Sequence, residues 1–392
     1  MLYDPYAEQM QVDPYPTYRY FLEEEPCTYN AEMDFYALFR FEDVWQATLD
    51  WQTFSSSLGP TLENRGEMPG EMMSIIGMDQ PRHTRLRNLV SRGFTPRRIG
   101  ELEGQVRDIA RTYLKQFVGS GGFDIQQEFS VKFPMDVISV LLGIPEEDRD
   151  QYRSWVDMGL ERDPETGKIP EANLAAMGQS SAYLLDLLKQ RRKQPKDDLI
   201  TVIAEAQYEE PGSEARPLSD LEVASFCGLL AAAGAETTAK LLGNAIVYLF
   251  QHPEQRQYLW DRSDRIPNGI EEILRYDVPS QFQGRVALKE ATVHGVTIPV
   301  GARVALVTGS ASRDPREFND PDTLDVERVQ NRKLYFGHGQ HFCIGKSLAR
   351  QEARVALEEI RDFFPHYEVD TSGLTRTYQA HVRGFKNVPI EV

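Results

Sequence analysis

The sequence predicts a mainly α-helical protein with a small β portion. Apolar residues recur at helical spacing in nine segments, whereas only three short stretches have the β-branched, glycine-punctuated character of strands. No internal repeat is present. A chain of 392 residues could form one large domain or two to three of average size, and length alone does not choose between them.

The predicted helices cover most of the chain. The segment 219–251 is apolar on most sides, which is typical of a helix buried in the interior. The full set of predicted helices is 15–23, 82–92, 98–118, 133–142, 172–192, 219–251, 253–261, 267–276 and 344–363. The strand-like stretches are 36–41, 291–309 and 386–392.

Three stretches rich in Pro, Gly and Glu are predicted loops, at 55–80, 160–171 and 193–217. The first of these is long and rich in methionine, a flexible residue that adapts to irregular apolar surfaces. We therefore expect 55–80 to form an adaptable lid over a binding site. The alternative is an ordinary surface loop without a binding role.

Composition restricts the possible partners. Asp and Glu number 60 and Lys and Arg number 43, which gives a formal net charge of −17. This balance repels phosphate backbones and anionic membranes, so neither nucleic acid nor a membrane surface is an expected partner. The three cysteines are odd in number and far apart, and the N-terminus lacks the features of a signal peptide. A cytoplasmic, reducing location is therefore expected.

One segment, 221–250, is long and apolar enough to be considered as a membrane span. Glu236 and Lys240 divide it into apolar runs shorter than the ~20 residues that a spanning helix needs. The segment is therefore predicted to be a buried helix.

A glycine-rich stretch, YFGHGQHFCIGKS, presents one cysteine just before the last predicted helix. His338, His341 and Cys343 could bind zinc, but zinc sites usually take four ligands and no second cysteine pair or HExxH motif exists to complete the set. The GKS triplet suggests a phosphate-binding loop, but that motif requires glycine where Gln340 stands.

A third interpretation makes Cys343 a thiolate ligand of haem iron. Glycines let the loop approach a flat macrocycle, and the N-terminus of the following helix stabilises a sulfur anion. This stretch resembles the F-G-x-G-x-H-x-C-x-G loop of cytochromes P450 through Phe336, Gly337, Gly339, His341, Cys343 and Gly345.

The resemblance extends from residue 13 to the C-terminus and implies one domain over residues 1–392 with the cytochrome P450 fold. Haem b (iron protoporphyrin IX) would lie between the long central helix and the helix after Cys343, which would be the iron ligand. The resemblance also implies haem contacts from Phe336, Gly337, Gly345, Ala233 and Gly234.

The long apolar helix contains a polar notch, AAAGAETTAK. Gly234 weakens the helix, and the Thr237 hydroxyl can bond back to the Ala233 carbonyl and bend it. The notch resembles the acid and alcohol pair of cytochromes P450. Glu236 and Thr237 would then be the catalytic residues that relay protons during oxygen activation.

Two charged pairs lie at helical spacing. Glu272 and Arg275 are three residues apart, and the resemblance joins them with Arg328 into a buried structural network. The segment 312–329 departs from the family at Ser312, where asparagine is frequent, and we expect only local consequences.

His83 and Arg87 are four residues apart and point from one helix face. The resemblance assigns this pair, with Arg285 and His341, to the haem propionates. A solvated basic face is the alternative.

The segment 82–98 contains six arginines and no acidic residue. Those of the arginines that haem does not use could form, together with Lys346, Arg350 and Arg354, a basic dock for an acidic electron donor such as a ferredoxin. Charge that serves only solvation is the alternative.

The resemblance implies a soluble, bacterial-type monooxygenase that uses O2 and takes electrons from a separate ferredoxin and reductase. Its substrate would be a lipophilic small molecule. The predicted pocket residues are Leu229, Leu230, Ala233, Met73, Ile76, Ser280, Gln281 and Phe282. A peroxygenase driven by hydrogen peroxide and a ligand-binding haem-thiolate sensor are alternatives, although a sensor has no need of Glu236 and Thr237 as a proton relay.

Overall fold

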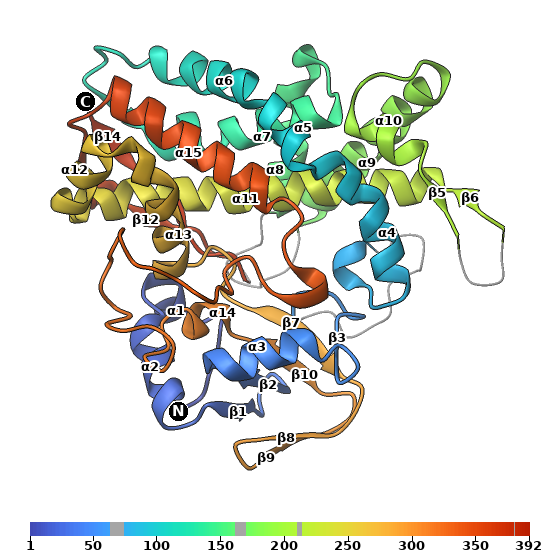
Figure 1. Ribbon diagram of the computed structural model, residues 1–392, viewed down its shortest axis with the longest axis vertical. Helices are drawn as coiled ribbons and strands as arrows, with labels where there is room; N and C mark the ends of the chain where they lie inside the picture. Colours follow the sequence, from blue (N-terminus) through green and yellow to red (C-terminus); the bar gives the residue numbers. More distant parts are fainter. Residues whose placement is uncertain (63–73, 161–169, 210–213, 380) are drawn as a thin grey trace.

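Figure 1 shows the computed structural model of the chain, in which a large helical region lies against a smaller region of strands. The structure describes residues 1–62, 74–160, 170–209, 214–379 and 381–392. The α-helices are α1 (Glu8–Val12), α2 (Tyr15–Glu23), α3 (Phe41–Leu49), α4 (Arg82–Ser91), α5 (Pro96–Glu101), α6 (Glu103–Lys115), α7 (Lys132–Leu142), α8 (Arg149–Leu160), α9 (Glu171–Lys193), α10 (Leu199–Ala204), α11 (Asp220–Gln251), α12 (Pro253–Asp261), α13 (Ile266–Tyr276), α14 (Thr308–Ala311) and α15 (Lys346–Phe363).

Helix α11 runs through the middle of the helical region, with α15 alongside it (Figure 1). Its 32 residues correspond to about 48 Å of helix. The Ser219 side chain accepts a hydrogen bond from the Glu222 backbone N–H at 3.2 Å, and the Glu222 carboxylate accepts one from the Ser219 N–H at 2.8 Å. Because α11 also packs against α7, α9 and α13, it needs apolar residues on most of its faces.

The main sheet has the strand order β1-β2-β10-β7-β3. Strands β2 and β10 are parallel, and the other neighbouring pairs are antiparallel. The strands of the chain are β1 (Cys27–Asn30), β2 (Phe35–Leu38), β3 (Phe54–Ser55), β4 (Gly122–Asp124), β5 (Gln207–Tyr208), β6 (Arg216–Pro217), β7 (Gln283–Ala287), β8 (Ala291–Val293), β9 (Val296–Ile298), β10 (Arg303–Leu306), β11 (Glu368–Val369), β12 (Thr375–Arg376), β13 (Phe385–Asn387) and β14 (Pro389–Glu391).

The hydrophobic core has one large cluster and two smaller ones. The large cluster fills the space between α11 and its helical neighbours. One small cluster lies between the main sheet and α3, and the other holds the N-terminal segment through aromatic rings. In the latter, Phe21 and Phe39 stack with ring centroids 4.5 Å apart, and Tyr3 meets Phe39 edge-on at 4.9 Å.

The structure confirms the predicted mainly helical fold with a small β portion. Every predicted helix is present near its expected bounds, although 98–118 is divided into α5 and α6. Among the described residues, no helix is long and apolar enough to cross a membrane.

Two predictions of local structure, one of a loop and one of a strand stretch, were wrong in part. The predicted loop 193–217 contains α10 and the β5–β6 hairpin, and the predicted strand stretch 291–309 ends in α14. Helix α10 has the sequence LITVIA, whose β-branched residues have low helix propensity. Burial of five of its six residues and the cap from Asp198, which accepts a hydrogen bond from the Thr201 N–H, stabilise it as a helix.

A buried ion network connects α13 to the chain that leads to the cysteine loop. Glu272 and Arg275 have fully buried side chains and form a two-point contact, at 2.6 and 2.8 Å. Arg328 contacts the same carboxylate at 3.1 Å, as the sequence predicts. Arg275 also donates to the backbone carbonyl of Ser312 at 3.0 Å. Because residue 312 contributes its backbone, the departure from asparagine does not alter this bond.

Replacing Glu272 with alanine is expected to destabilise the protein strongly, because it leaves Arg275 charged and buried without its partner. The expected loss in the free energy of unfolding is on the order of 3–5 kcal/mol, measured by urea denaturation. The control is Glu101→Ala, which removes the exposed Arg97–Glu101 pair on α5 and should cost no more than ~0.5 kcal/mol. Equal urea midpoints for the two variants would contradict the structural role of Glu272.

Candidate functional site

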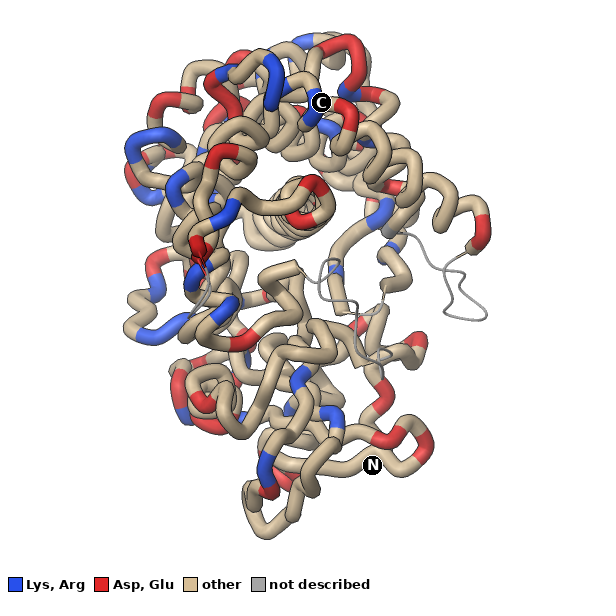
Figure 2. Tube along the Cα trace, turned by 90° about the vertical axis from the view of Figure 1, so that its right-hand side faces the viewer, with Lys and Arg blue, Asp and Glu red and all other residues tan. Residues whose placement is uncertain are grey.

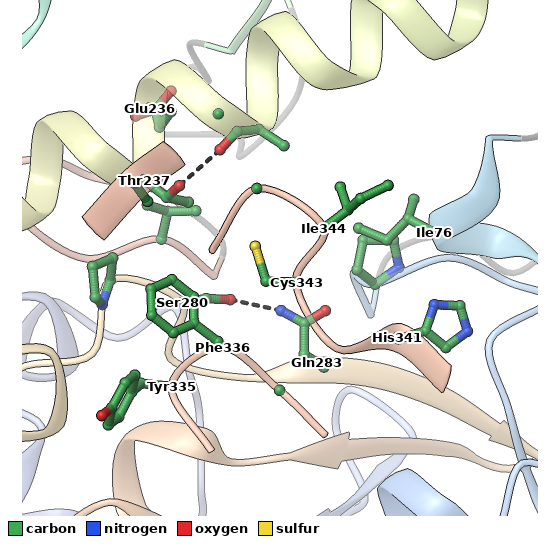
Figure 3. A pocket seen from close by; sticks show the side chains of 18 of the residues that line it. Ile76, Glu236, Thr237, Ser280, Gln283, Tyr335, Phe336, His341, Cys343 and Ile344 are labelled. Carbon is green, nitrogen blue, oxygen red and sulfur yellow. Dashed lines mark hydrogen bonds between the residues drawn. The ribbon is translucent and has the colours of Figure 1, made fainter. Parts of the chain in front are cut away.

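The cysteine loop, residues 335–345, is folded tightly on itself. Gly337 and Gly339 adopt left-handed backbone angles, with φ of +71° and +65°. A Cβ atom at Gly339 would lie 2.8 Å from the Thr48 carbonyl oxygen, so only glycine fits there. The Cys343 N–H donates to the Phe336 carbonyl at 2.8 Å. The loop therefore directs the Cys343 sulfur into the space below α11 (Figure 3).

The surroundings of Cys343 favour a negatively charged sulfur only in part. Burial raises the pKa of the Cys343 thiol, while the backbone N–H of Gly345 and the charges of Arg87, Lys346 and Arg350 act to lower it. A cation bound at the sulfur would add the missing positive charge, since metal coordination deprotonates a thiol outright. The site is therefore suited to a metal-bound thiolate.

Cationic and imidazole side chains gather beside the cysteine loop. His83 and Arg87 project from α4, and the His83 ring lies 4.3 Å from the His341 ring between centroids. The Arg87 guanidinium donates to the Phe342 carbonyl, which ties α4 to the loop. The fourth member, Arg285, lies on β7 and is also buried.

This cluster is strongly desolvated, and several of its ring nitrogens make no hydrogen bond to a described residue. Burial is the main cause that lowers the pKa of His83 to about 4, of His341 to about 2 and of Arg285 to about 10. Neighbouring positive charges add to the effect, while the Asp79 carboxylate opposes it at His83 and Arg285. Neither ring nitrogen of His83, nor Nε2 of His341, has a hydrogen-bond partner among the described residues. Buried polar groups in native proteins are normally paired, so the cluster fits an anionic ligand such as the haem propionates.

The polar notch of α11 lies opposite the cysteine (Figure 3). The Thr237 hydroxyl donates to the Ala233 carbonyl at 2.7 Å, which confirms the predicted back-bond. Glu236 is one residue earlier, with 12% of its side chain exposed, and lies 3.5 Å from the Lys240 ammonium group. Ala233, Gly234, Glu236 and Thr237 all border the same cavity as Cys343.

That cavity has a volume of about 1080 Å³ and joins the cysteine loop to α11, α4 and β7. It places most of the predicted site residues together. The predicted residues that line it are His83, Arg87, Leu229, Leu230, Ala233, Gly234, Glu236, Thr237, Ser280, Arg285, Phe336, Gly337, His341, Cys343, Gly345 and Ile76.

Two of the predicted pocket residues that the structure describes are not found at this cavity. Gln281 and Phe282 are absent from its lining: Gln281 is bonded to the Tyr18 hydroxyl at 2.9 Å, and Phe282 belongs to the N-terminal aromatic cluster. Gln281 turns away because the backbone at Ser280 bridges to Val382, so the next side chain points to the opposite side. Phe282 is held away from the cavity by its packing in the aromatic cluster. Met73 lies outside the described residues.

The sequence interpretation also missed several cavity residues, most of which come from segments without a recognised motif. These are Thr48, Thr61, Gln283, Thr308, Glu352, Gln379, His381 and Val382. Glu352 lies on α15 and is almost fully buried, and burial raises its pKa well above the usual value of a carboxyl group despite a hydrogen bond with Thr238. Its position nine residues after Cys343 on a predicted helix was the available signal.

The predicted basic dock carries less net charge than the sequence suggests. Figure 2 shows Lys and Arg interspersed with Asp and Glu over the helical region. The ion pairs of these basic residues are Arg82–Glu222, Arg97–Glu101, Arg98–Asp197, Arg350–Glu271 and Arg354–Glu103. Arg85, Arg92 and Lys346 form no ion pair with any residue that the structure describes. Acidic residues, most of them distant in the sequence, thus neutralise much of the local positive charge.

Comparison with known proteins agrees with this geometry. A family model described as Cytochrome P450 matches residues 175–373. A Mycobacterium tuberculosis relative whose name contains "cytochrome P450 123" is 40% identical over 395 residues, which cover 100% of this chain and 97% of the relative. The chain belongs to the cytochrome P450 family. The vitamin D(3) 25-hydroxylase of Pseudonocardia autotrophica is 36% identical to this P450, over 99% of the chain and 96% of the relative.

Solved P450 structures have the same fold. CYP109Q5 from Chondromyces apiculatus matches with a TM-score of 0.89 and 31% identity, over 99% of this chain and 97% of that one. CYP109E1 from Bacillus megaterium, solved with corticosterone, matches with a TM-score of 0.87 and 29% identity, over 98% and 99%. The chain is therefore a haem-dependent monooxygenase, an oxidoreductase that uses O2 and a small-molecule substrate.

Replacing Cys343 with serine is expected to abolish the absorption spectrum typical of a thiolate-ligated haem when the reduced protein binds carbon monoxide, because the serine oxygen does not replace the thiolate. The control is Cys27→Ala, which removes another buried cysteine, located on β1, and should leave that spectrum unchanged. A normal thiolate spectrum in the Cys343→Ser protein would refute the ligand prediction.

Proposed function

We propose that this P450 inserts one oxygen atom of O2 into a lipophilic small molecule, with Cys343 as the iron ligand. The observation that carries the proposal is the cavity, which brings the cysteine, the basic cluster, the polar notch of α11 and an apolar wall into one space. Bound haem supplies the activation of O2 and the oxidation of the substrate. His83, Arg87, Arg285 and His341 hold its propionates by charge and hydrogen bonding.

Thr237 and Glu236 deliver protons in this proposal. The Thr237 hydroxyl gives its hydrogen to the Ala233 carbonyl, so its oxygen keeps lone pairs with which it accepts a hydrogen bond in the cavity. Glu236, on the preceding position of the helix, is partly accessible and can take protons from water and pass them inward. The surrounding apolar side chains exclude bulk water from this path.

The lining of the cavity supports a lipophilic substrate. Its wall includes apolar residues from α7, α9 and α11 and from the segments before and after α4, namely Ile75, Ile76, Phe94, Ile138, Leu174, Leu229, Leu230 and Leu241. Ser280 accepts a hydrogen bond from Gln283 at 2.6 Å, and this pair can orient one polar group of the substrate (Figure 3).

The ligands of related solved structures support the same broad class of substrate. CYP109E1 was solved with corticosterone and with testosterone, P450BioI with a hexadecenoic acid attached to acyl carrier protein, and EryK with erythromycin B. These ligands are apolar over most of their surface and differ in shape. We therefore propose a lipophilic substrate without choosing among steroid, fatty-acid and macrolide classes.

Electrons come from a separate ferredoxin-type protein in this proposal, and the compartment is the cytoplasm. Arg85, Arg92 and Lys346 are the basic residues available to an acidic donor, and Lys346 lies directly beside the cysteine loop, over the Phe342 ring at 4.2 Å. All three cysteines are unpaired, which suits a reducing compartment.

The rate of reduction by a ferredoxin should fall as salt is added, because salt screens the attraction between the basic residues and an acidic donor.

The test of the proposed function is a substrate screen followed by isotope labelling. Ligands that shift the haem absorption band are incubated with ferredoxin, reductase, NADPH and isotopically labelled O2, and products are analysed by mass spectrometry. One labelled oxygen atom in a product supports the proposal. Product formed with hydrogen peroxide but never with the donor proteins would indicate a peroxygenase. Binding without product under either condition would indicate a ligand-binding haem protein.

Thr237→Ala is expected to uncouple electron use from product formation, because water loses its hydrogen-bond acceptor at the end of the relay. The fraction of electrons recovered in product should fall by about tenfold or more, with hydrogen peroxide released instead. The measurement is NADPH consumed against product formed. Thr237→Ser keeps the hydroxyl group and should retain most of the coupling. Unchanged coupling in Thr237→Ala would contradict the relay role and indicate that Thr237 only packs against its neighbours.

A further inference from the structure

Two side chains hold one oxygen atom of the Glu236 carboxylate. The Gln379 side-chain amide donates to Oε1 at 2.7 Å, and the Lys240 ammonium group lies 3.5 Å from the same atom. Among the described residues, none makes a hydrogen bond to Oε2. One oxygen is therefore fixed, while the other remains able to exchange protons.

Lys240 is a buried cation, with only 5% of its surface exposed. Glu236 is its one ion-pair partner among the residues that the structure describes, and a buried ammonium group without a partner would be costly. The aliphatic part of Lys240 packs against Gly384, where a Cβ atom would lie 2.6 Å from the lysine side chain. The chain near residue 384 is thus shaped to accommodate this lysine.

Gln379 and Gly384 belong to one segment, here called the C-terminal turn and defined as residues 377–379 and 381–384. Several hydrogen bonds fix it. Its two ends are joined by the bond from the Thr377 N–H to the Gly384 carbonyl at 3.1 Å. The bonds that join it to the segment after α13 are Gln281 N–H to His381 carbonyl at 2.8 Å, Arg383 N–H to Pro279 carbonyl at 2.7 Å and Arg383 Nε to Asp277 at 3.1 Å.

We propose that Gln379 and Lys240 are positioning residues for Glu236, and that the C-terminal turn supports the proton relay as well as forming part of the cavity wall. The turn contributes His381 and Val382 to the same cavity that Glu236 borders. This inference rests on the proposed function of Glu236 as a proton donor.

The two contacts keep the carboxylate in one orientation during turnover. Glu236 Oε2 takes a proton from water and passes it toward Thr237, which regenerates the carboxylate and leaves the Lys240 ammonium group and the neutral Gln379 amide unchanged. Without the contacts, the side chain can adopt other rotamers, and the fraction of time that Oε2 spends in reach of the relay falls.

The test uses Gln379→Leu and Lys240→Met, which keep similar side-chain volume and remove the hydrogen bond or the charge. We expect about a tenfold fall in product formed per electron, together with a larger solvent isotope effect on turnover. Substrate affinity, measured by titration of the haem absorption band, should change less than about twofold. Thr375→Val is the control, because it removes an exposed hydrogen bond to Asn387 in the adjoining β12–β13 pair, and should match the parent protein.

A second measurement is independent of turnover. The infrared carboxylate band that disappears in Glu236→Ala should shift in Gln379→Leu and in Lys240→Met, and should not shift in Thr375→Val. An unchanged band in both positioning variants would overturn the inference even if one of them were too unstable to assay.

A double-mutant comparison separates positioning from a direct substrate contact. Gln379→Leu should have no further effect on coupling in a Glu236→Ala background, since the carboxylate it positions is already absent. An equal loss in both backgrounds would overturn the inference. If Glu236→Ala were itself fully coupled, the proposed relay would fail, whereas a fully coupled Gln379→Leu beside an uncoupled Glu236→Ala would overturn only the positioning role.

Discussion

The functional site depends on one constraint, which is that the chain must hold the thiol of Cys343 in place and directed toward α11. The bond from the Cys343 N–H to the Phe336 carbonyl and the close approach of Gly339 to Thr48 define the loop that achieves this. The Glu272–Arg275–Arg328 network fixes the preceding segment to α13. Since buried ion pairs contribute little net stability, the value of this network lies in holding one geometry.

Charge inside the cavity is divided between two places. Positive and imidazole groups lie beside the cysteine loop, where Arg285, His83 and His341 lack partners among the described residues or are strongly desolvated. The Glu236 carboxylate lies on α11 and already has Lys240 and Gln379. The first set is incomplete without an anionic ligand, and the second is complete in the protein itself. This difference matches a permanent cofactor on one side and a group that must exchange protons on the other.

Sequence reasoning succeeded where the relevant information is local. Helical spacing gave the shared face of His83 and Arg87, the Glu272–Arg275 contact and the back-bond of Thr237, since residues three or four apart on a helix are neighbours. It failed for Gln281 and Phe282, because side-chain direction in an irregular segment depends on distant pairing. It also overestimated the charge of 82–98, because Glu222 and Asp197, the partners of Arg82 and Arg98, lie far along the chain and could not be matched from spacing.

The cavity residues that the sequence predicts and those that it does not predict have different consequences for substrate specificity. The chemistry-bearing residues come from recognisable motifs on α4, α11 and the cysteine loop, whereas much of the remaining wall comes from segments without motifs, such as those holding Thr61, Gln283 and His381. An apolar wall distinguishes ligands weakly, by about 1–3 kcal/mol for each methylene group. A partly buried polar pair such as Ser280 and Gln283 discriminates more strongly, because a ligand that cannot bond to it leaves polar atoms unsatisfied. The choice of substrate therefore rests on the few polar residues of the motif-free wall rather than on the apolar majority.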